Sequence, residues 1–318
     1  MRHSMLGRLE VPVLFLGCGN FGGIGSPPEF YGRGDDQATA FGVMDAALAA
    51  GVRMFDTADS YGGGVSEDWI GRWLVERGTR DDVLLTTKVG SPVGDEGGGL
   101  SRRHIRGQIE ASLRRLRTDR VDLHLAHAPD SETPVVETVA TFAELVAEGK
   151  IAHYGLSNYS RVELEAALAA VSELGVVGPV NLQCGYNLLD RAESADTFEV
   201  CARAGIGFTA FSPLAGGLLT GKYRADEPPP ANSRLSLRPP VMVDRDQTFA
   251  ALARLAAAAE GYGVPLATLA LAWLLADPAV AALVVGPRSP AQLATMCAAL
   301  ELSLSEDERA ELVRIQQQ

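Results

Sequence analysis

The chain has 318 residues, 47% of them hydrophobic, and 40 acidic against 28 basic side chains give it a formal net charge of −12. A chain of this length and composition can bury a large core, which excludes intrinsic disorder and a small disulfide-stapled scaffold. The low pI of about 4.9 argues against nucleic acid or an anionic membrane as the main partner, because the long-range field repels polyanions.

The N-terminus resembles a secretion signal only in part. Arg2 and Arg8 precede an apolar run over residues 11–16, but this run is short, contains Pro12 and lacks a small-residue cleavage site. We interpret the run as a first barrel strand. The four cysteines are scattered without a CxxC pair, which is typical of a reducing compartment, so we expect a cytoplasmic protein.

Short apolar runs alternate with segments of helical period along the whole chain. The predicted strands are Leu14–Gly17, Met54–Asp56, Val83–Lys88, Val121–Ala126, Ile151–Leu156, Val180–Cys184, Gly207–Phe211 and Ala281–Val285. Such alternation predicts a parallel sheet, and eight strands with helical crossovers predict an α/β fold of the (β/α)₈ TIM-barrel type. We expect one domain over residues 1–318, with an extra C-terminal helix.

A glycine motif follows the first predicted strand. Gly17-Cys18-Gly19-Asn20-Phe21-Gly22 matches the GxGxxG pattern of Rossmann dinucleotide sites. That site requires a helix to begin at its glycines, whereas this chain continues as coil to Pro27 and Pro28. We expect these glycines to let backbone approach a ligand at the mouth of a barrel, and a Rossmann dehydrogenase is the weaker alternative.

Three segments of the C-terminal third have distinct patterns. Residues 223–245 hold five of the 17 prolines and no apolar period, which predicts a lid, with a passive surface loop as the alternative. The run Val264–Val285 is long enough to span a bilayer, but Asp277-Pro278 interrupts it and predicts a helix followed by a buried strand. Ser305 and Glu308 match a capping box, which predicts the C-terminal helix.

Four polar side chains stand where barrel enzymes place reactive groups, at the carboxyl ends of strands or in the loops that follow. Asp56, Lys88 and His127 close three predicted strands, and Tyr61 follows Asp56 by five residues. Taken singly, each has a structural explanation, such as a buried ion pair between Asp56 and Lys88. His124 and His127 are three apart on a strand and therefore point to opposite faces, so we expect no metal site.

Motifs along the chain resemble those of the aldo-keto reductase superfamily, and of its bacterial and potassium-channel beta-subunit-like branch in particular. They are Gly51-Val52-Arg53-Met54-Phe55-Asp56-Thr57-Ala58 with Tyr61-Gly62, Ser112-Leu113-Arg114-Arg115-Leu116 with Asp122-Leu123 and His127, Gly155-Leu156-Ser157-Asn158, Gln183-Cys184-Gly185-Tyr186-Asn187, and Phe211-Ser212-Pro213-Leu214 with Gly221-Lys222-Tyr223. The resemblance extends over most of the chain. It implies a (β/α)₈ barrel that binds a nicotinamide coenzyme across its mouth.

Carbonyl reduction explains why such a site needs these residue types. Hydride transfer leaves an alkoxide that requires a proton, so a general acid must stand beside the nicotinamide. The resemblance gives this role to Tyr61. A cation about 4 Å from the phenol oxygen favours tyrosinate by about 4 kcal/mol at an effective dielectric constant of about 20, before solvent losses. Lys88 would be that cation, Asp56 would keep it charged, and a neutral His127 would orient the substrate oxygen.

The resemblance also assigns coenzyme contacts. Ser157, Asn158 and Gln183 match positions that hold the nicotinamide carboxamide, and Phe211 matches the aromatic position under the ring. The complete predicted set is Gly19, Asn20, Ser157, Asn158, Gln183, Phe211, Ser212, Pro213, Leu214, Gly216, Lys222, Arg234, Gly286, Arg288 and Gln292. A guanidinium at Arg288 favours the 2′-phosphate of NADP(H), with NAD(H) as the alternative.

These features together predict an NADP(H)-dependent oxidoreductase that interconverts carbonyls and alcohols. Its partner would be a small aldehyde, ketone or alcohol, with polar carbonyls including sugars among the candidates. An alternative from another class is a cofactor-binding, redox-sensing regulatory subunit with slow turnover.

Overall fold

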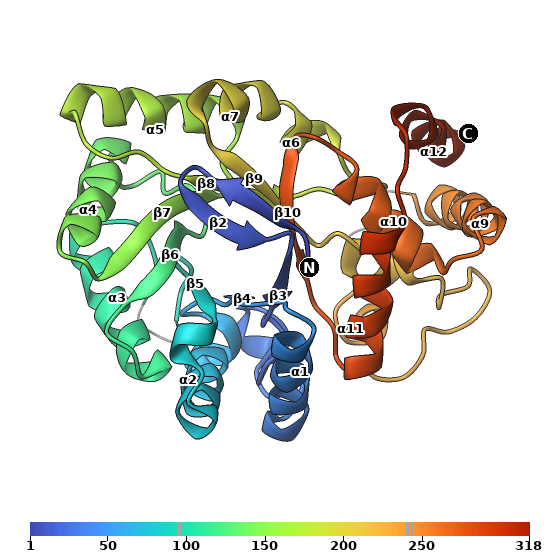
Figure 1. Ribbon diagram of the computed structural model, residues 1–318, viewed down its shortest axis with the longest axis horizontal. Helices are drawn as coiled ribbons and strands as arrows, with labels where there is room; N and C mark the ends of the chain where they lie inside the picture. Colours follow the sequence, from blue (N-terminus) through green and yellow to red (C-terminus); the bar gives the residue numbers. More distant parts are fainter. Residues whose placement is uncertain (94–96, 240–241, 243) are drawn as a thin grey trace.

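Eight parallel strands close into a barrel in a computed structural model that describes residues 1–93, 97–239, 242 and 244–318 (Figure 1). The strand order around the barrel is β10-β3-β4-β5-β6-β7-β8-β9. The strands are β3 (Leu14–Gly17), β4 (Met54–Asp56), β5 (Leu84–Val89), β6 (Val121–Ala126), β7 (Ile151–Ser157), β8 (Asn181–Gly185), β9 (Gly207–Phe211) and β10 (Val280–Val285). Each lies within one residue of its predicted bounds, so the predicted (β/α)₈ barrel is confirmed.

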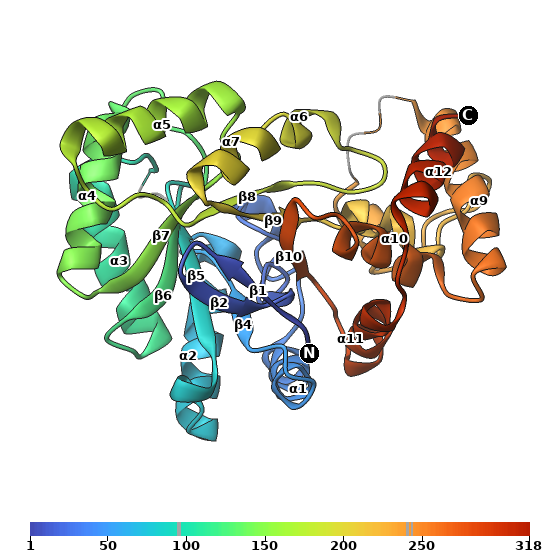
Figure 2. The ribbon, with the colours of Figure 1, turned by 45° about the horizontal axis from the view of Figure 1, so that its top comes forward.

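Helices surround the barrel and shield its outer face (Figures 1 and 2). They include α1 (Gln37–Ala49), α2 (Val65–Arg77), α3 (Arg102–Leu116), α4 (Val135–Ala147), α5 (Arg161–Leu174), α6 (Ala192–Ala195), α7 (Phe198–Ala204) and α11 (Pro290–Cys297). Helix α3 illustrates why they form. Its side chains at steps of four, four and three, Ile105, Ile109, Leu113 and Leu116, are all buried, and the Ser101 hydroxyl caps its first turn.

A hairpin that the sequence analysis did not anticipate covers the amino-terminal end of the barrel. Strands β1 (His3–Leu6) and β2 (Leu9–Pro12) pair antiparallel, and Figure 1 shows them lying across the barrel. Leu6 and Val11 are fully buried in one cluster with Phe15 and other residues of the barrel interior. The interpretation of residues 11–16 as a single strand is therefore wrong. A tight turn at Gly7, which has a φ of +56°, folds the first residues back before β3 begins.

The C-terminal third agrees with its predicted elements. Helix α10 (Leu266–Leu275) is followed by the buried strand β10, and helix α12 (Glu306–Gln317) begins at a capping box formed by Ser305 and Glu308. Helix α12 packs beside α9 (Arg245–Gly261). Within the described residues no single helix is long and apolar enough to cross a membrane, and only the pair α9 and α10, bent by 86°, passes that test jointly on length and composition.

Candidate active site

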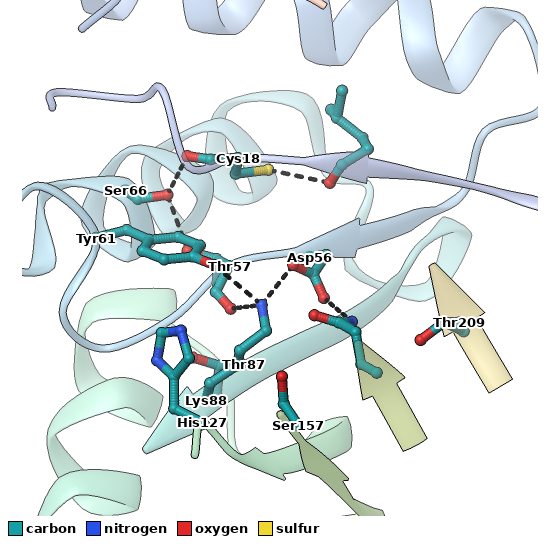
Figure 3. Close-up of polar contacts among 12 residues, drawn as sticks. Cys18, Asp56, Thr57, Tyr61, Ser66, Thr87, Lys88, His127, Ser157 and Thr209 are labelled. Atoms are coloured by element: carbon teal, nitrogen blue, oxygen red, sulfur yellow. Dashed lines mark hydrogen bonds and ion pairs between the residues drawn. The ribbon is translucent and has the colours of Figure 1, made fainter. Parts of the chain in front are cut away.

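The four predicted catalytic side chains meet at the carboxyl end of the barrel (Figure 3). Asp56 ends β4, Lys88 lies on β5, His127 follows β6, and Tyr61 begins the short 3₁₀ segment η2 (Tyr61–Gly64). Closure of the sheet brings these strand ends together, and all four side chains line one cavity of about 890 Å³. The sequence prediction that they share a site thus agrees with the geometry.

Lys88 is the centre of this group. Its side chain is 2% exposed, and its Nζ donates to Asp56 Oδ1 at 2.5 Å, to the Thr57 carbonyl at 3.0 Å and to the Tyr61 hydroxyl at 3.3 Å. Burial disfavours the charged form, but attraction to Asp56 and Tyr61 outweighs it and raises the pKa of Lys88. The lysine is therefore an ammonium ion throughout the neutral range.

Two opposing influences act on the pKa of the Tyr61 hydroxyl. Burial raises the pKa of the phenol, whereas the Lys88 ammonium lowers it, and burial is the larger influence. The cation lies where the sequence analysis expected it and acts in the expected direction, but the net shift is upward. Tyr61 consequently keeps its proton at neutral pH, as a group must if it is to donate that proton to a strong base such as an alkoxide.

His127 is held in a neutral form by its surroundings. Burial, and secondarily the Lys88 charge, lower the pKa of His127 to about 3. Its ring meets Tyr61 edge-on with 5.7 Å between centroids, its Nδ1 lies 3.1 Å from Ser91 Oγ, and its carbonyl accepts from Asn158 Nδ2 at 2.8 Å. A neutral imidazole offers one donor and one acceptor, which suits it to orient a carbonyl oxygen.

His124 points away from this site, as predicted from the spacing of the two histidines. It is fully buried, its Nδ1 lies 3.2 Å from the Thr87 carbonyl, and its ring packs against Phe142 of α4. Burial lowers the pKa of His124 to about 4. Over the described residues, no group of three His, Cys, Asp or Glu side chains is arranged to hold a metal ion.

The two buried histidines make the protein sensitive to acid. In the unfolded chain both histidines become protonated below about pH 6.5. In the folded protein they stay neutral until the pH approaches their pKa values, about 4 for His124 and about 3 for His127. The free energy of unfolding is therefore expected to fall by up to about 1.4 kcal/mol per pH unit for each histidine. Urea unfolding between pH 7 and pH 5 measures this slope. His127→Gln should have a shallower slope, and an unchanged one would contradict the expectation.

A buried polar network that the sequence analysis missed supports the strand that carries Lys88 and the loop that follows Asp56. Glu67 of α2 is fully buried and accepts from Thr87 Oγ1 at 2.5 Å and from Arg115 Nε at 2.7 Å. Nearby, Ser66 Oγ donates to the Cys18 carbonyl and bonds the Thr57 hydroxyl (Figure 3). Serine and glutamate are ordinary residues for a first helical turn, so no sequence signal indicated that these two are buried.

The predicted coenzyme-binding residues line the same cavity. Each member of the set, from Gly19 and Asn20 to Gly286, Arg288 and Gln292, borders it. Beyond Phe211 the chain turns through η4 (Ala215–Thr220), where positive φ angles at Gly216 and Gly217 suit glycine. Gln183 is already engaged, because its Nε2 donates to Asp56 Oδ2 at 2.9 Å. The roles of these residues in binding remain predictions.

The proline-rich segment 223–245 contributes to the cavity wall through residues 230–234, Leu237 and Arg238. It contains the short helix α8 (Arg234–Leu237), and positions 240, 241 and 243 lie outside the described residues. Among its described residues, two hydrogen bonds attach it to loops of the barrel: Arg238 Nη1 donates to the Ile24 carbonyl at 3.0 Å, and Arg288 Nη1 donates to the Asn232 carbonyl at 2.6 Å.

Arg288 also has an acidic partner that the sequence analysis did not anticipate. Its Nε donates to Asp35 Oδ1 at 2.6 Å, and the Asp35 side chain is only 2% exposed. Burial lowers the pKa of the neighbouring Arg234 to about 10, assisted by repulsion from Arg238 and Arg288. Three guanidinium groups and Lys222 therefore border one cavity of an acidic protein.

Comparison with known proteins identifies the fold family. The sequence model of the Aldo/keto reductase family matches residues 14–317. The chain belongs to the aldo/keto reductase family. This aldo/keto reductase is 35% identical to "Uncharacterized oxidoreductase YrpG" of Bacillus subtilis, with 96% of this chain and 93% of the relative covered. It is also 34% identical to "Probable voltage-gated potassium channel subunit beta" of Oryza sativa, with 95% and 92% covered, and 33% identical to the Arabidopsis thaliana protein of the same description, with 92% and 89% covered.

Both parts of the predicted resemblance are therefore confirmed, the superfamily and the branch near the channel beta subunits. Family membership makes the protein an oxidoreductase.

Proposed function

We propose that this aldo/keto reductase is an NADP(H)-dependent enzyme that interconverts aldehydes or ketones with alcohols. The observation that carries the proposal is the Tyr61 hydroxyl, which accepts from Lys88, a buried lysine that is charged at neutral pH, inside a large cavity. No metal is required for this chemistry, because a phenol acid and an imidazole donor serve the carbonyl oxygen.

The side chains that line the cavity suit the phosphate, carboxamide and ring groups of a nicotinamide dinucleotide. Lys222, Arg234 and Arg288 bring positive charge to one region, which fits the phosphates of a dinucleotide. Amide and hydroxyl groups at Ser157 and Asn158 fit a carboxamide, and Phe211 offers an aromatic face. When bound, the reduced coenzyme would supply the hydride.

Side chains of the protein would orient the substrate's carbonyl oxygen and protonate it. His127 would orient the carbonyl oxygen with a ring N–H, and Tyr61 would give its proton to that oxygen as negative charge develops there. Lys88 would stabilise the tyrosinate that remains, and Asp56 would keep Lys88 charged. In the reverse direction Tyr61 would accept the proton.

The direct test is coenzyme oxidation with a panel of aldehydes, ketones and sugars, comparing NADPH with NADH. We expect turnover with at least one carbonyl class and a preference for NADPH. Tight NADPH binding with negligible turnover over the whole panel would overturn the enzyme proposal. It would favour the regulatory subunit instead, a second function supported by the likeness to probable potassium channel beta subunits.

Arg288 is expected to determine the NADPH preference. Hydrogen bonds to charged groups contribute about 1.5–3 kcal/mol, so Arg288→Ala should weaken NADPH binding roughly 10- to 150-fold. NADH lacks the 2′-phosphate and should bind nearly as before. Fluorescence titration of both coenzymes measures the two affinities. Arg314→Ala, which removes an exposed arginine of α12, is the control, and equal losses for both coenzymes in Arg288→Ala would contradict the assignment.

The remaining features of the proposal concern organisation and location. Residues 1–318 would act as one domain, because the hairpin, the barrel and α12 pack on one another.

Residues 223–245 would serve as a coenzyme lid, supported by the contacts of Arg238 and of the Asn232 carbonyl with the barrel. The four cysteines are free thiols and three are buried, which supports a cytoplasmic location.

A further inference from the structure

The neutral ring of His127 can act on a substrate oxygen only if the correct nitrogen carries its single proton. A neutral imidazole has one N–H and one bare nitrogen, and only the N–H can donate to a carbonyl. Nδ1 of His127 is already in contact with Ser91 Oγ at 3.1 Å. Nε2 is therefore the ring nitrogen left to face the cavity that His127 lines.

We propose that Ser91 is a positioning residue that donates its hydroxyl proton to His127 Nδ1 and thereby keeps the ring proton on Nε2. Ser91 lies two residues beyond β5, so the loop after the lysine strand would set the tautomer of the histidine that follows β6. The consequence for catalysis rests on the proposed function, whereas the tautomer itself does not.

The surroundings of the ring restrict the alternatives. The imidazolium form, in which both nitrogens donate, is disfavoured by burial and by the nearby Lys88 charge. The backbone of His127 is fixed by the 2.8 Å bond from Asn158 Nδ2 to its carbonyl, and its ring is packed against Tyr61. With the ring held in place, Ser91 is the group that faces Nδ1: as a donor its hydroxyl keeps the ring proton on Nε2, and as an acceptor it would keep that proton on Nδ1.

His124 provides an internal reference with the opposite tautomer. Its Nδ1 lies 3.2 Å from the Thr87 carbonyl, and a carbonyl oxygen can only accept. The proton of a neutral His124 must therefore be on Nδ1. The two histidines, three residues apart, are expected to be protonated on different nitrogens, because the Thr87 carbonyl can only accept whereas the Ser91 hydroxyl is proposed to donate.

Long-range ¹H–¹⁵N correlation spectra of the protein labelled at its five histidine imidazoles test the assignment at pH 7. The His127 signals are identified by their loss in His127→Gln. We expect His127 to carry its proton on Nε2 and His124 on Nδ1. In Ser91→Ala, His127 should become a mixture of both tautomers while His124 is unchanged, and Ser91→Thr should restore the Nε2 form. A wild-type His127 protonated on Nδ1, or an unchanged His127 spectrum in Ser91→Ala, would overturn the proposal.

Kinetics separate this inference from the proposed function. Ser91→Ala should lower kcat for carbonyl reduction by about twofold or more, in proportion to the lost Nε2 form, with the KM for NADPH unchanged. Ser91→Thr should recover the rate, and Ser131→Ala, which alters an exposed loop serine, should have no effect. Ser91→Ala with full kcat would overturn the catalytic consequence. A wild-type protein with the expected tautomers but no turnover would refute the enzyme proposal and leave the Ser91 assignment intact.

Discussion

Tyr61→Phe is expected to lower carbonyl reduction by about two to four orders of magnitude, the usual contribution of a positioned general acid. The variant keeps the ring that packs against His127 and loses only the hydroxyl that Lys88 contacts. Coenzyme affinity should be nearly unchanged, because the predicted coenzyme contacts do not include that hydroxyl. Steady-state rates with NADPH and fluorescence titration of NADPH measure the two quantities separately.

Tyr154→Phe is the matched control for this substitution. Tyr154 is also buried, but its hydroxyl donates to the Val177 carbonyl rather than lining the cavity. Its loss should cost about 1 kcal/mol of stability and leave turnover intact. If Tyr61→Phe retained most of its activity, the general acid would have to be another group.

Asp56→Asn is expected to destabilise the fold by about 3–5 kcal/mol, since removing one member of a buried ion pair leaves the other charge uncompensated. Both side chains are almost completely buried, at 2% for Lys88 and 3% for Asp56. Burial lowers the pKa of Lys88 and the negative charge of Asp56 raises it. Without that charge, the pKa of Lys88 should fall. Urea unfolding at pH 7 measures the loss.

The pH dependence and a double variant check the cause of this loss. Because the pKa of folded Lys88 is raised, its stabilising contribution is present below its unfolded pKa of about 10.4 and disappears as pH rises through the folded value. The difference in the free energy of unfolding between the wild-type protein and Asp56→Asn should therefore become smaller at strongly alkaline pH. Adding Lys88→Met should recover part of the stability, and a double variant less stable than Asp56→Asn would contradict the ion-pair explanation.

Much of the barrel and of the catalytic group was predictable because both depend on local patterns. Apolar runs interrupted by helical segments mark parallel strands, and polar residues that end such runs must gather at one end of a closed sheet. Asp56, Lys88 and His127 are located by this argument alone. The assignment of Tyr61 and of the coenzyme set required the family resemblance, since loop residues carry no such periodicity.

The features that escaped prediction depend on contacts between distant segments. Arg288 and Asp35 are 253 residues apart, and Ser91 and His127 are 36 apart. No spacing rule joins such positions until the barrel closes. The N-terminal hairpin was missed because its second strand continues directly into β3. The net upward pKa shift of Tyr61 depends on the depth of burial, which composition and spacing do not give.

If the proposed function holds, the hairpin of β1 and β2 limits the routes by which protons could reach the site. Leu6 and Val11 fill the amino-terminal end with hydrocarbon, and the cavity that Tyr61, Lys88 and Asp56 line lies at the other end of the barrel. Under the proposed function, a proton that Tyr61 gives to product would then have to be replaced through the same opening that admits substrate. Re-protonation of the phenol would consequently follow product departure, which makes the emptied mouth part of each catalytic cycle.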